Sequence, residues 1–187
     1  MKKIICFFLI IAALTSFTAF AAKSAPESAE ANFRNLCVLI NQRLSCMKDV
    51  AAYKHKNNIP IEDLARERIV LLNSTCDAAK FGLSPEAAKE FFQLQINLAK
   101  KIQKNWIAKW STEDMPEKFN CKDLKTEIRP ELIKIGRQII LQLKSLKHSS
   151  LPLQVKQQIV IEKINVKYIS KSDKLLLLKA ILKLQQQ

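Results

Sequence analysis

The scarcity of glycine constrains this fold more than any other feature of the sequence. The chain of 187 residues contains 2 glycines and long stretches of Leu, Ile, Lys, Gln and Glu, which favour helix. No alternation of apolar and polar residues competes with apolar residues at helical three-to-four spacing. The sequence therefore predicts an all-α fold, a single-domain bundle of about six helices.

Start and stop signals divide the chain into these helices. Ser84 and Pro85 are typical of a helix start, with serine as the N-cap and proline at the first helical position. Ser172 and Asp173 are expected to cap the last helix. No linker separates two domains, so residues 22–187 are expected to form one domain. After a polar lead over 23–31, the predicted helices span about 32–57, 61–80, 85–110, 122–143, 152–167 and 172–187.

The first 21 residues have the three parts of a secretory signal peptide. Lys2 and Lys3 precede an apolar run over 4–14, and a small-residue site follows at Ala19-Phe20-Ala21. We expect cleavage after Ala21, a periplasmic or secreted protein, and no stable membrane insertion afterwards. The alternative is an uncleaved membrane anchor, because the apolar segment is nearly long enough to span a bilayer.

The chain is strongly basic. Without Lys2 and Lys3 it keeps 29 basic residues against 17 acidic ones, a net charge of +12. Such an excess favours anionic partners, but composition does not decide between nucleic acid, an acidic membrane surface and a small carboxylate. Solvated lysines on outer helix faces account for most of the charge, and Lys100 and Lys101 are expected to be of this kind.

Export would place the cysteines in an oxidising compartment, where they can form disulfides. If the first helix is continuous, Cys37 and Cys46 lie on opposite sides of it with a rise beyond the roughly 7 Å that a bridge allows, so this pairing is excluded. Two full connectivities and a single bridge remain open. No Cys-x-x-Cys pair exists and the two histidines are isolated, so no metal site is expected. The four cysteines after the signal peptide are Cys37, Cys46, Cys76 and Cys121.

Two cations interrupt the apolar stripe of the first predicted helix. Arg43 and Lys54 share that stripe with Leu36, Ile40, Met47 and Val50. Eleven residues bring the two cations to within about 20° of one face, roughly 16 Å apart along the axis. Burying both without partners would cost several kcal/mol, so either acidic side chains or a wet, anion-binding pocket must receive them.

Two further polar residues break or flank apolar stripes. Gln103 takes a core-facing place on the third helix, and Arg129 lies beside the stripe of the fourth. Each polar residue taken alone has a structural interpretation, as a buried ion pair, a snorkelling cation, a satisfied core amide or a surface arginine. Trp106 and Trp110 are expected to pack in the core.

In chain order, these residues resemble the exported chorismate mutases of the AroQ gamma class, and the resemblance covers roughly 35–143. It implies the all-helical AroQ-type fold and the conversion of chorismate to prephenate, without a cofactor and without a covalent intermediate. It also implies a homodimer with each pocket inside one chain, and no nucleic-acid partner. The matching pieces are Arg43, Lys54, the segment 59–63 (Ile-Pro-Ile-Glu-Asp), Arg66-Glu67, Gln95-Ile96, the segment 99–103 (Ala-Lys-Lys-Ile-Gln) and the segment 128–132 (Ile-Arg-Pro-Glu-Leu).

The resemblance implies a role for the cations and the amide. Lys54 and Gln103 match the pair that donates hydrogen bonds to the ether oxygen of chorismate. Arg43 and Arg129 match carboxylate clamps, for which the planar guanidinium suits the geometry. Arg66 matches a residue that helps to bind a carboxylate.

The remaining matches lie at the edge of the implied pocket. Glu67, or the backbone near Asp63, would receive the ring hydroxyl of chorismate. Ala99 stands where some members have serine or threonine, and Val70 stands where some have glutamine. Each of these departures removes a possible hydrogen bond, which bears on affinity more than on the chemistry.

Two rival functions stay open at this point. The chain could be a non-catalytic, basic helical module that binds an anionic partner, which its net charge would support. It could also be a related enzyme on the same scaffold, an isochorismate pyruvate-lyase.

Overall fold

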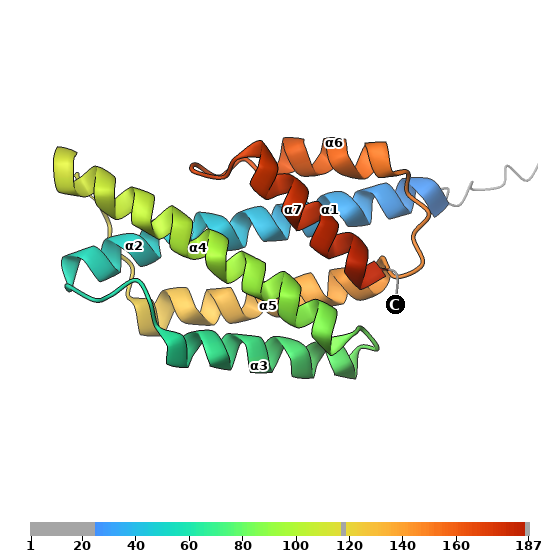
Figure 1. The fold of residues 1–187 in the computed structure, drawn as a ribbon, viewed down its shortest axis with the longest axis horizontal. Coiled ribbons are helices and arrows are strands. Elements are labelled where there is room, and N and C mark those ends of the chain that lie inside the picture. The colour runs from blue at the N-terminus through green and yellow to red at the C-terminus, as the bar shows by residue number, and fades with distance from the viewer. Residues whose placement is uncertain (1–24, 117–118, 186–187) are drawn as a thin grey trace, which may run out of the picture.

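The protein is all-α, as predicted. The computed structural model describes residues 25–116 and 119–185, and over these ranges it contains helices and no strands (Figure 1). The predicted signal peptide lies outside the described residues. The helices are α1 (Ala25–Ser45), α2 (Met47–Lys56), α3 (Leu64–Lys80), α4 (Pro85–Glu113), the one-turn π-helix η1 (Leu124–Ile128), α5 (Arg129–Ser145), α6 (Leu153–Lys163) and α7 (Lys171–Gln185).

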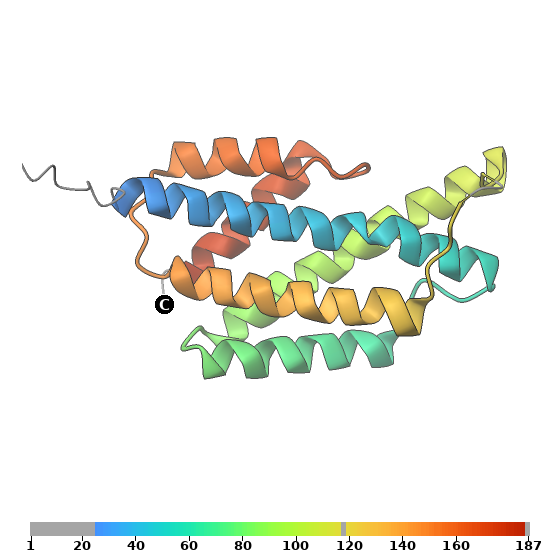
Figure 2. The same ribbon diagram turned by 180° about the vertical axis from the view of Figure 1, so that it is seen from behind.

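The helices form two crossing sets. Helices α1, α5 and α3 run along the long axis of the molecule, with α5 between the other two, and α6 lies along α1 (Figure 2). The long helix α4 crosses this set obliquely and contacts α2, α3 and α7. The middle of α4, over residues 92–103, therefore faces α2, α3 and α5 together, which is where polar side chains gather.

The first predicted helix is longer than expected and is divided into two. It begins at Ala25 instead of residue 32, because Pro26 is tolerated in a first turn, the alanines and glutamates over 27–31 favour helix, and Glu30 pairs with Arg34 at 2.9 Å one turn on. A turn at Cys46 separates α1 from α2. Cys46 keeps helical dihedrals, and Val50 N–H donates to its carbonyl at 3.0 Å. The helical register therefore passes through the turn nearly unchanged.

Side-chain caps set the starts of the next two helices. Asp63 is the N-cap of α3, where its carboxylate accepts the Arg66 N–H at 3.0 Å, so the helix starts after Asp63 and not near residue 61. Ser84 caps α4, as predicted, by accepting the Ala87 N–H at 3.2 Å. The cap at Asp63 matters for the site, because it fixes a carboxylate at the end of α3.

In the second half of the chain, the helices depart from their predicted boundaries at three places. The predicted helix over 122–143 begins as η1, whose π-turn leads directly into α5. Helix α6 ends at Lys163, earlier than predicted. Helix α7 is capped by Ser170 and not by Ser172, because Ser170 Oγ accepts the Asp173 N–H at 3.2 Å while the Asp173 carboxylate accepts the Ser170 N–H at 2.8 Å.

One large apolar core draws side chains from every α-helix of the bundle. Its largest fully buried members include Phe33, Phe91, Phe92, Ile102 and Ile139. A smaller cluster forms around Trp110, and Trp106 stacks on Trp110 with 5.3 Å between ring centroids. Trp110 is buried, and Trp106 is partly buried against the core, in line with the prediction that both pack there.

All four cysteines of the described chain are free, so the disulfide stays a prediction. Cys37 lies in the core, where burial raises the pKa of its thiol to about 12. Cys46 is half-buried, and burial together with the nearby Glu131 raises its pKa to about 11. Within the described part of the chain, no helix combines the length and the apolarity needed to cross a bilayer.

The two faces of α5 provide a test of the core. Ile139 is 0% exposed and Leu141, two residues on, is 48% exposed. Ile139→Ala should lower the free energy of unfolding by about 2–5 kcal/mol, because it leaves a cavity. Leu141→Ala should change it by no more than about 0.5 kcal/mol. Urea denaturation measures both, and equal losses would contradict the assigned orientation of α5.

Candidate active site

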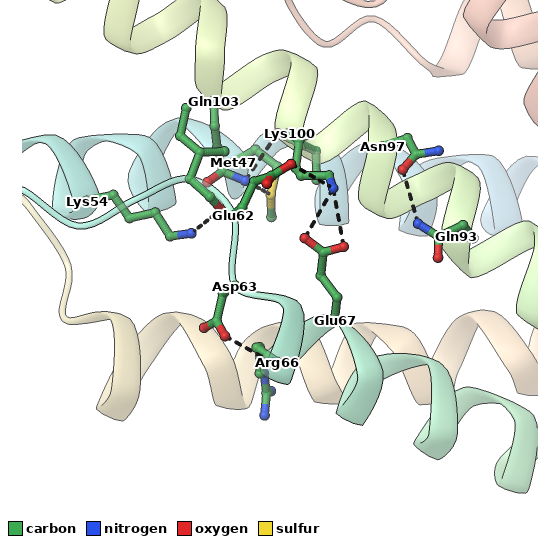
Figure 3. A network of polar contacts seen from close by, with 12 residues as sticks. Met47, Lys54, Glu62, Asp63, Arg66, Glu67, Gln93, Asn97, Lys100 and Gln103 are labelled. Carbon is green, nitrogen blue, oxygen red and sulfur yellow. Dashed lines mark hydrogen bonds and ion pairs between the residues drawn. The ribbon is translucent and has the colours of Figure 1, made fainter.

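The nine residues predicted for the site line one cavity of about 450 Å³. The cavity lies where α4 faces α1, α2, α3 and α5. Figure 3 shows how side chains from α2, α3 and α4 meet there. Polar residues thus come together from five helices that are distant in sequence. The nine residues are Arg43, Lys54, Asp63, Arg66, Glu67, Val70, Ala99, Gln103 and Arg129.

Arg43 is one of two buried cations of the cavity. Its side chain projects from α1 and is 6% exposed, and it forms no ion pair with any described residue. Its Nε has no hydrogen-bond partner. Burial, with a smaller contribution from the charge of Arg66, lowers the pKa of Arg43 to about 10, so the guanidinium is still cationic at neutral pH. Arg43 therefore offers an anion an unneutralised positive charge.

Lys54 enters the same cavity from α2 and is 6% exposed. Its Nζ donates to the Ile61 carbonyl at 2.6 Å, which holds the segment between α2 and α3 against the cavity (Figure 3). An ammonium has three donors, so two remain for a ligand. Burial lowers the pKa of Lys54, Asp63 opposes this effect, and Arg129 adds to it.

Gln103 supplies a neutral donor from α4. The side chain is 5% exposed, and its Nε2 donates to the Ala99 carbonyl at 3.2 Å and lies 3.6 Å from Met47 Sδ. Its Oε1 has no partner. The buried amide therefore uses its nitrogen but not its oxygen in hydrogen bonds, and the side chain of Ala99 has no donor for that oxygen.

Arg129 and Asp63 join the ends of two helices at the cavity. Arg129 stands at the start of α5, directly after the π-turn of η1, and its Nη2 donates to Asp63 Oδ2 at 3.3 Å. The other Asp63 oxygen is held by the cap of α3. Burial lowers the pKa of the neighbouring Arg66, the charge of Arg129 lowers it further, and Asp63 opposes both.

Glu67 is paired with Lys100, a residue that the sequence analysis assigned to solvent. That assignment was wrong: Lys100 lines the cavity, its side chain is 21% exposed, and its Nζ lies 3.2 Å from Glu67 Oε1 and 3.6 Å from Glu62. Lys101 is exposed, as predicted, and pairs at the surface with Asp173 at 2.6 Å. Helical spacing contained the missing signal, because residues 96, 99, 100 and 103 form one stripe.

The rest of the cavity wall is mainly apolar. Val70 on α3, Ile96 and Ala99 on α4 and Leu132 on α5 belong to it. Over the described residues, no three His, Cys, Asp or Glu side chains gather into a group that could hold a metal ion. The arrangement is suited to binding a small anion with a ring, since cations and amide donors line a partly apolar cavity.

The unpaired charge of Arg43 predicts a conflict between stability and binding. Arg43→Met should raise the free energy of unfolding of the ligand-free protein by about 1 kcal/mol or more, because an apolar side chain of similar length removes a buried cation without a partner. The same variant should lose stabilisation by a dicarboxylate ligand. Urea denaturation with and without ligand measures both effects. A loss of stability without ligand would show that Arg43 is a structural residue.

Comparisons with known proteins agree on one family. Residues 34–104 match the family chorismate mutase type II. The chain is 40% identical to a secreted chorismate mutase from Yersinia pestis over 111 residues, which cover 58% of this chain and 60% of that protein. It is 29% identical to a monofunctional chorismate mutase from Enterobacter agglomerans over 154 residues, covering 82% and 83% of the two chains.

A solved structure supports the same relationship. The crystal structure of the secreted chorismate mutase from Yersinia pestis superimposes with a TM-score of 0.74 and 28% identity, covering 80% of this chain and 96% of that one. The family match includes the stretch that carries most of the cavity, from Arg43 to Gln103. The chain is thus similar to chorismate mutases in sequence over residues 34–104 and in its fold.

Proposed function

We propose that this protein is a chorismate mutase, an isomerase that converts chorismate to prephenate without a cofactor. The observation that carries the proposal is the single cavity in which an unpaired, buried Arg43 meets the donors of Lys54 and Gln103. Chorismate carries two carboxylates, a ring hydroxyl and an enolpyruvyl ether oxygen. Its charge and its ring match the cations and the apolar wall of the cavity.

The carboxylates of chorismate are bound by arginines in this proposal. Arg43 receives one of them, which neutralises its buried charge. Arg129 receives the other with guanidinium donors beyond the one bonded to Asp63 at 3.3 Å, and Arg66 assists it. Holding both ends of the substrate favours the folded conformer in which the two carbons that will bond lie close together.

Lys54 and Gln103 act on the bond that breaks. As the C–O bond lengthens, negative charge grows on the ether oxygen, so donors fixed beside it stabilise the transition state more than the ground state. Lys54 is held by the Ile61 carbonyl at 2.6 Å and Gln103 by the Ala99 carbonyl at 3.2 Å. Both donors are therefore positioned before the substrate binds.

The ring hydroxyl is received by Glu67 or by the backbone near Asp63, at the start of α3. Ala99 and Val70 provide no polar side-chain contact, so the affinity for chorismate depends mainly on the arginines.

We also propose that the protein is exported and dimeric. Relatives named secreted chorismate mutases, from Yersinia pestis and Mycolicibacterium smegmatis, support export through the predicted signal peptide. All nine predicted site residues line one cavity of a single chain, which is consistent with a homodimer whose pockets are each complete within one subunit. Sizing of the purified protein with multi-angle light scattering tests the dimer.

Incubation of the purified protein with chorismate, and separately with isochorismate, distinguishes the three candidate functions. A mutase removes the absorbance of chorismate and produces prephenate, which is identified by chromatography. A pyruvate-lyase instead releases pyruvate from isochorismate. No turnover of either compound at micromolar protein would contradict both enzyme functions and favour a basic binding module, whose affinity for a polyanion should fall with salt.

Lys54 has a matched control on its own helix. Lys54→Ala should lower kcat/KM roughly 10²-fold or more, about 2.7 kcal/mol of transition-state stabilisation, because the donor at the ether oxygen is lost. Lys56→Ala removes the same charge from an exposed position and should change kcat/KM less than about twofold. Thermal unfolding of both variants checks the fold. If Lys54→Ala lowers the stability but the folded variant keeps its specific activity, Lys54 is structural.

The pH dependence of kcat/KM tests the two donors together. Lys54 is a charged donor only when protonated, and burial lowers its pKa below the ordinary 10.5, so activity should decline at a lower pH than for an exposed lysine. Gln103 donates at any pH, so kcat/KM should be flat from about pH 5 to about pH 8. Gln103→Glu must be protonated to donate, so its kcat/KM should instead rise as the pH falls. A flat profile for that variant would contradict the role of Gln103.

A further inference from the structure

The geometry points to a further positioning residue, Lys100, and this inference rests on the proposed function. We propose that Lys100 fixes the carboxylate of Glu67 for the ring hydroxyl of the substrate and keeps that carboxylate away from the cations of the cavity. Lys100 acts through Glu67 and not on the reacting atoms.

The contact between the two residues has the form of a clamp. Lys100 Nζ lies 3.2 Å from one oxygen of Glu67 and 3.3 Å from the other, so the ammonium faces the centre of the carboxylate (Figure 3). The side chains are 21% and 17% exposed, so solvent screens the pair less than it screens an open surface pair. Glu62 lies farther away, at 3.6 Å, and is 63% exposed, which makes it the weaker partner.

Lys100 anchors the carboxylate of Glu67. Among the described residues, Lys100 is the only hydrogen-bond or ion-pair partner of its carboxylate. The side chain of Glu67 has three rotatable bonds, so a single partner decides where its charge lies. The two residues come from different helices, α3 and α4, and the orientation of Glu67 therefore depends on the packing of these helices against each other.

Release of Glu67 would harm binding in two ways. Its carboxylate would lose its fixed place beside the ring hydroxyl. It would also be free to turn towards the cavity, where Arg43 and Lys54 form no ion pair with any described residue. A carboxylate of the protein would then compete with a carboxylate of the substrate for the same cations. Both effects weaken ground-state binding, so KM should respond more than kcat.

Lys101 provides a matched control. It is the next residue of α4 and carries the same charge, but it pairs with Asp173 of α7 at 2.6 Å, outside the cavity. Substitution by methionine suits both positions, because it removes the ammonium and keeps most of the aliphatic stem. A general effect of losing charge or an ion pair on α4 would appear in both variants.

Steady-state kinetics of Lys100→Met, Lys100→Arg and Lys101→Met test the proposal. Lys100→Met should raise KM roughly tenfold with a smaller change in kcat, and Lys100→Arg should recover most of the loss, because a guanidinium can also bind the carboxylate. Lys101→Met should resemble the wild type. Equal kinetics for Lys100→Met and Lys101→Met would overturn the proposal. Thermal unfolding of each variant checks that it is folded.

A double-mutant cycle identifies the residue through which Lys100 acts. If it acts through Glu67, then adding Lys100→Met to Glu67→Gln should change kcat/KM less than about twofold. If the two substitutions instead lower kcat/KM independently, so that their fold-losses multiply in the double variant, Lys100 does not act through Glu67. If the wild-type protein does not convert chorismate, the proposed function fails and this role fails with it. If the wild type converts chorismate and only the variant results disagree, the inference about Lys100 alone fails.

Discussion

The burial of Arg43 without an acidic partner is the constraint on which the site depends. A guanidinium that is 6% exposed has lost most of its hydration, and its unpaired Nε leaves part of that loss uncompensated. Other interactions must offset the free-energy cost of burying this guanidinium. The apolar core that α1 shares with α5, α6 and α4 provides that stabilisation. A bound carboxylate would supply the missing partner. Ligand binding and folding are therefore coupled at this residue.

The surrounding helices hold the other polar groups by their ends and connections. Lys54 bonds the carbonyl of Ile61 in the segment between α2 and α3, and this segment turns at Asn58, a residue that tolerates its positive φ of 54°. Asp63 then caps α3 with one oxygen and binds Arg129 with the other. A chain of local contacts thus joins three helix ends around the cavity. Donors preorganised in this way do not have to reorient as charge develops.

The sequence predicted the inward-facing residues well, because helical periodicity alone determines which side chains share a face. Arg43, Lys54 and Gln103 are buried as the apolar stripes indicated. Periodicity passed through the turn at Cys46, since that residue keeps helical dihedrals. Helical periodicity also places Lys100 on the same face as Ala99 and Gln103. Lys100 was nevertheless assigned to solvent, because lysines are generally expected to be solvated.

Contacts between distant segments could not be predicted from the residues alone. The pairing of Lys100 with Glu67 depends on how α3 packs against α4, and that of Arg129 with Asp63 on how α5 meets the start of α3. The π-turn of η1 was also missed, because η1 arises where the Asp123 side chain accepts two backbone N–H groups, at 2.8 and 2.7 Å, just before α5. The resemblance to a family indicated which residues belong together, and the structure provides the distances between them.

The charges of the cavity divide into a paired and an unpaired set, and this division fits the proposed chemistry. Asp63 neutralises Arg129 and Glu67 neutralises Lys100, whereas three cations form no ion pair with any described residue. A substrate with two carboxylates compensates two of these charges in the ground state. The third then faces the oxygen on which charge grows only as the C–O bond breaks, so its attraction is strongest in the transition state. In the proposed mechanism, Lys54 is this third cation, beside Arg43 and Arg66, because it lines the cavity and has donors beyond the one bonded to Ile61.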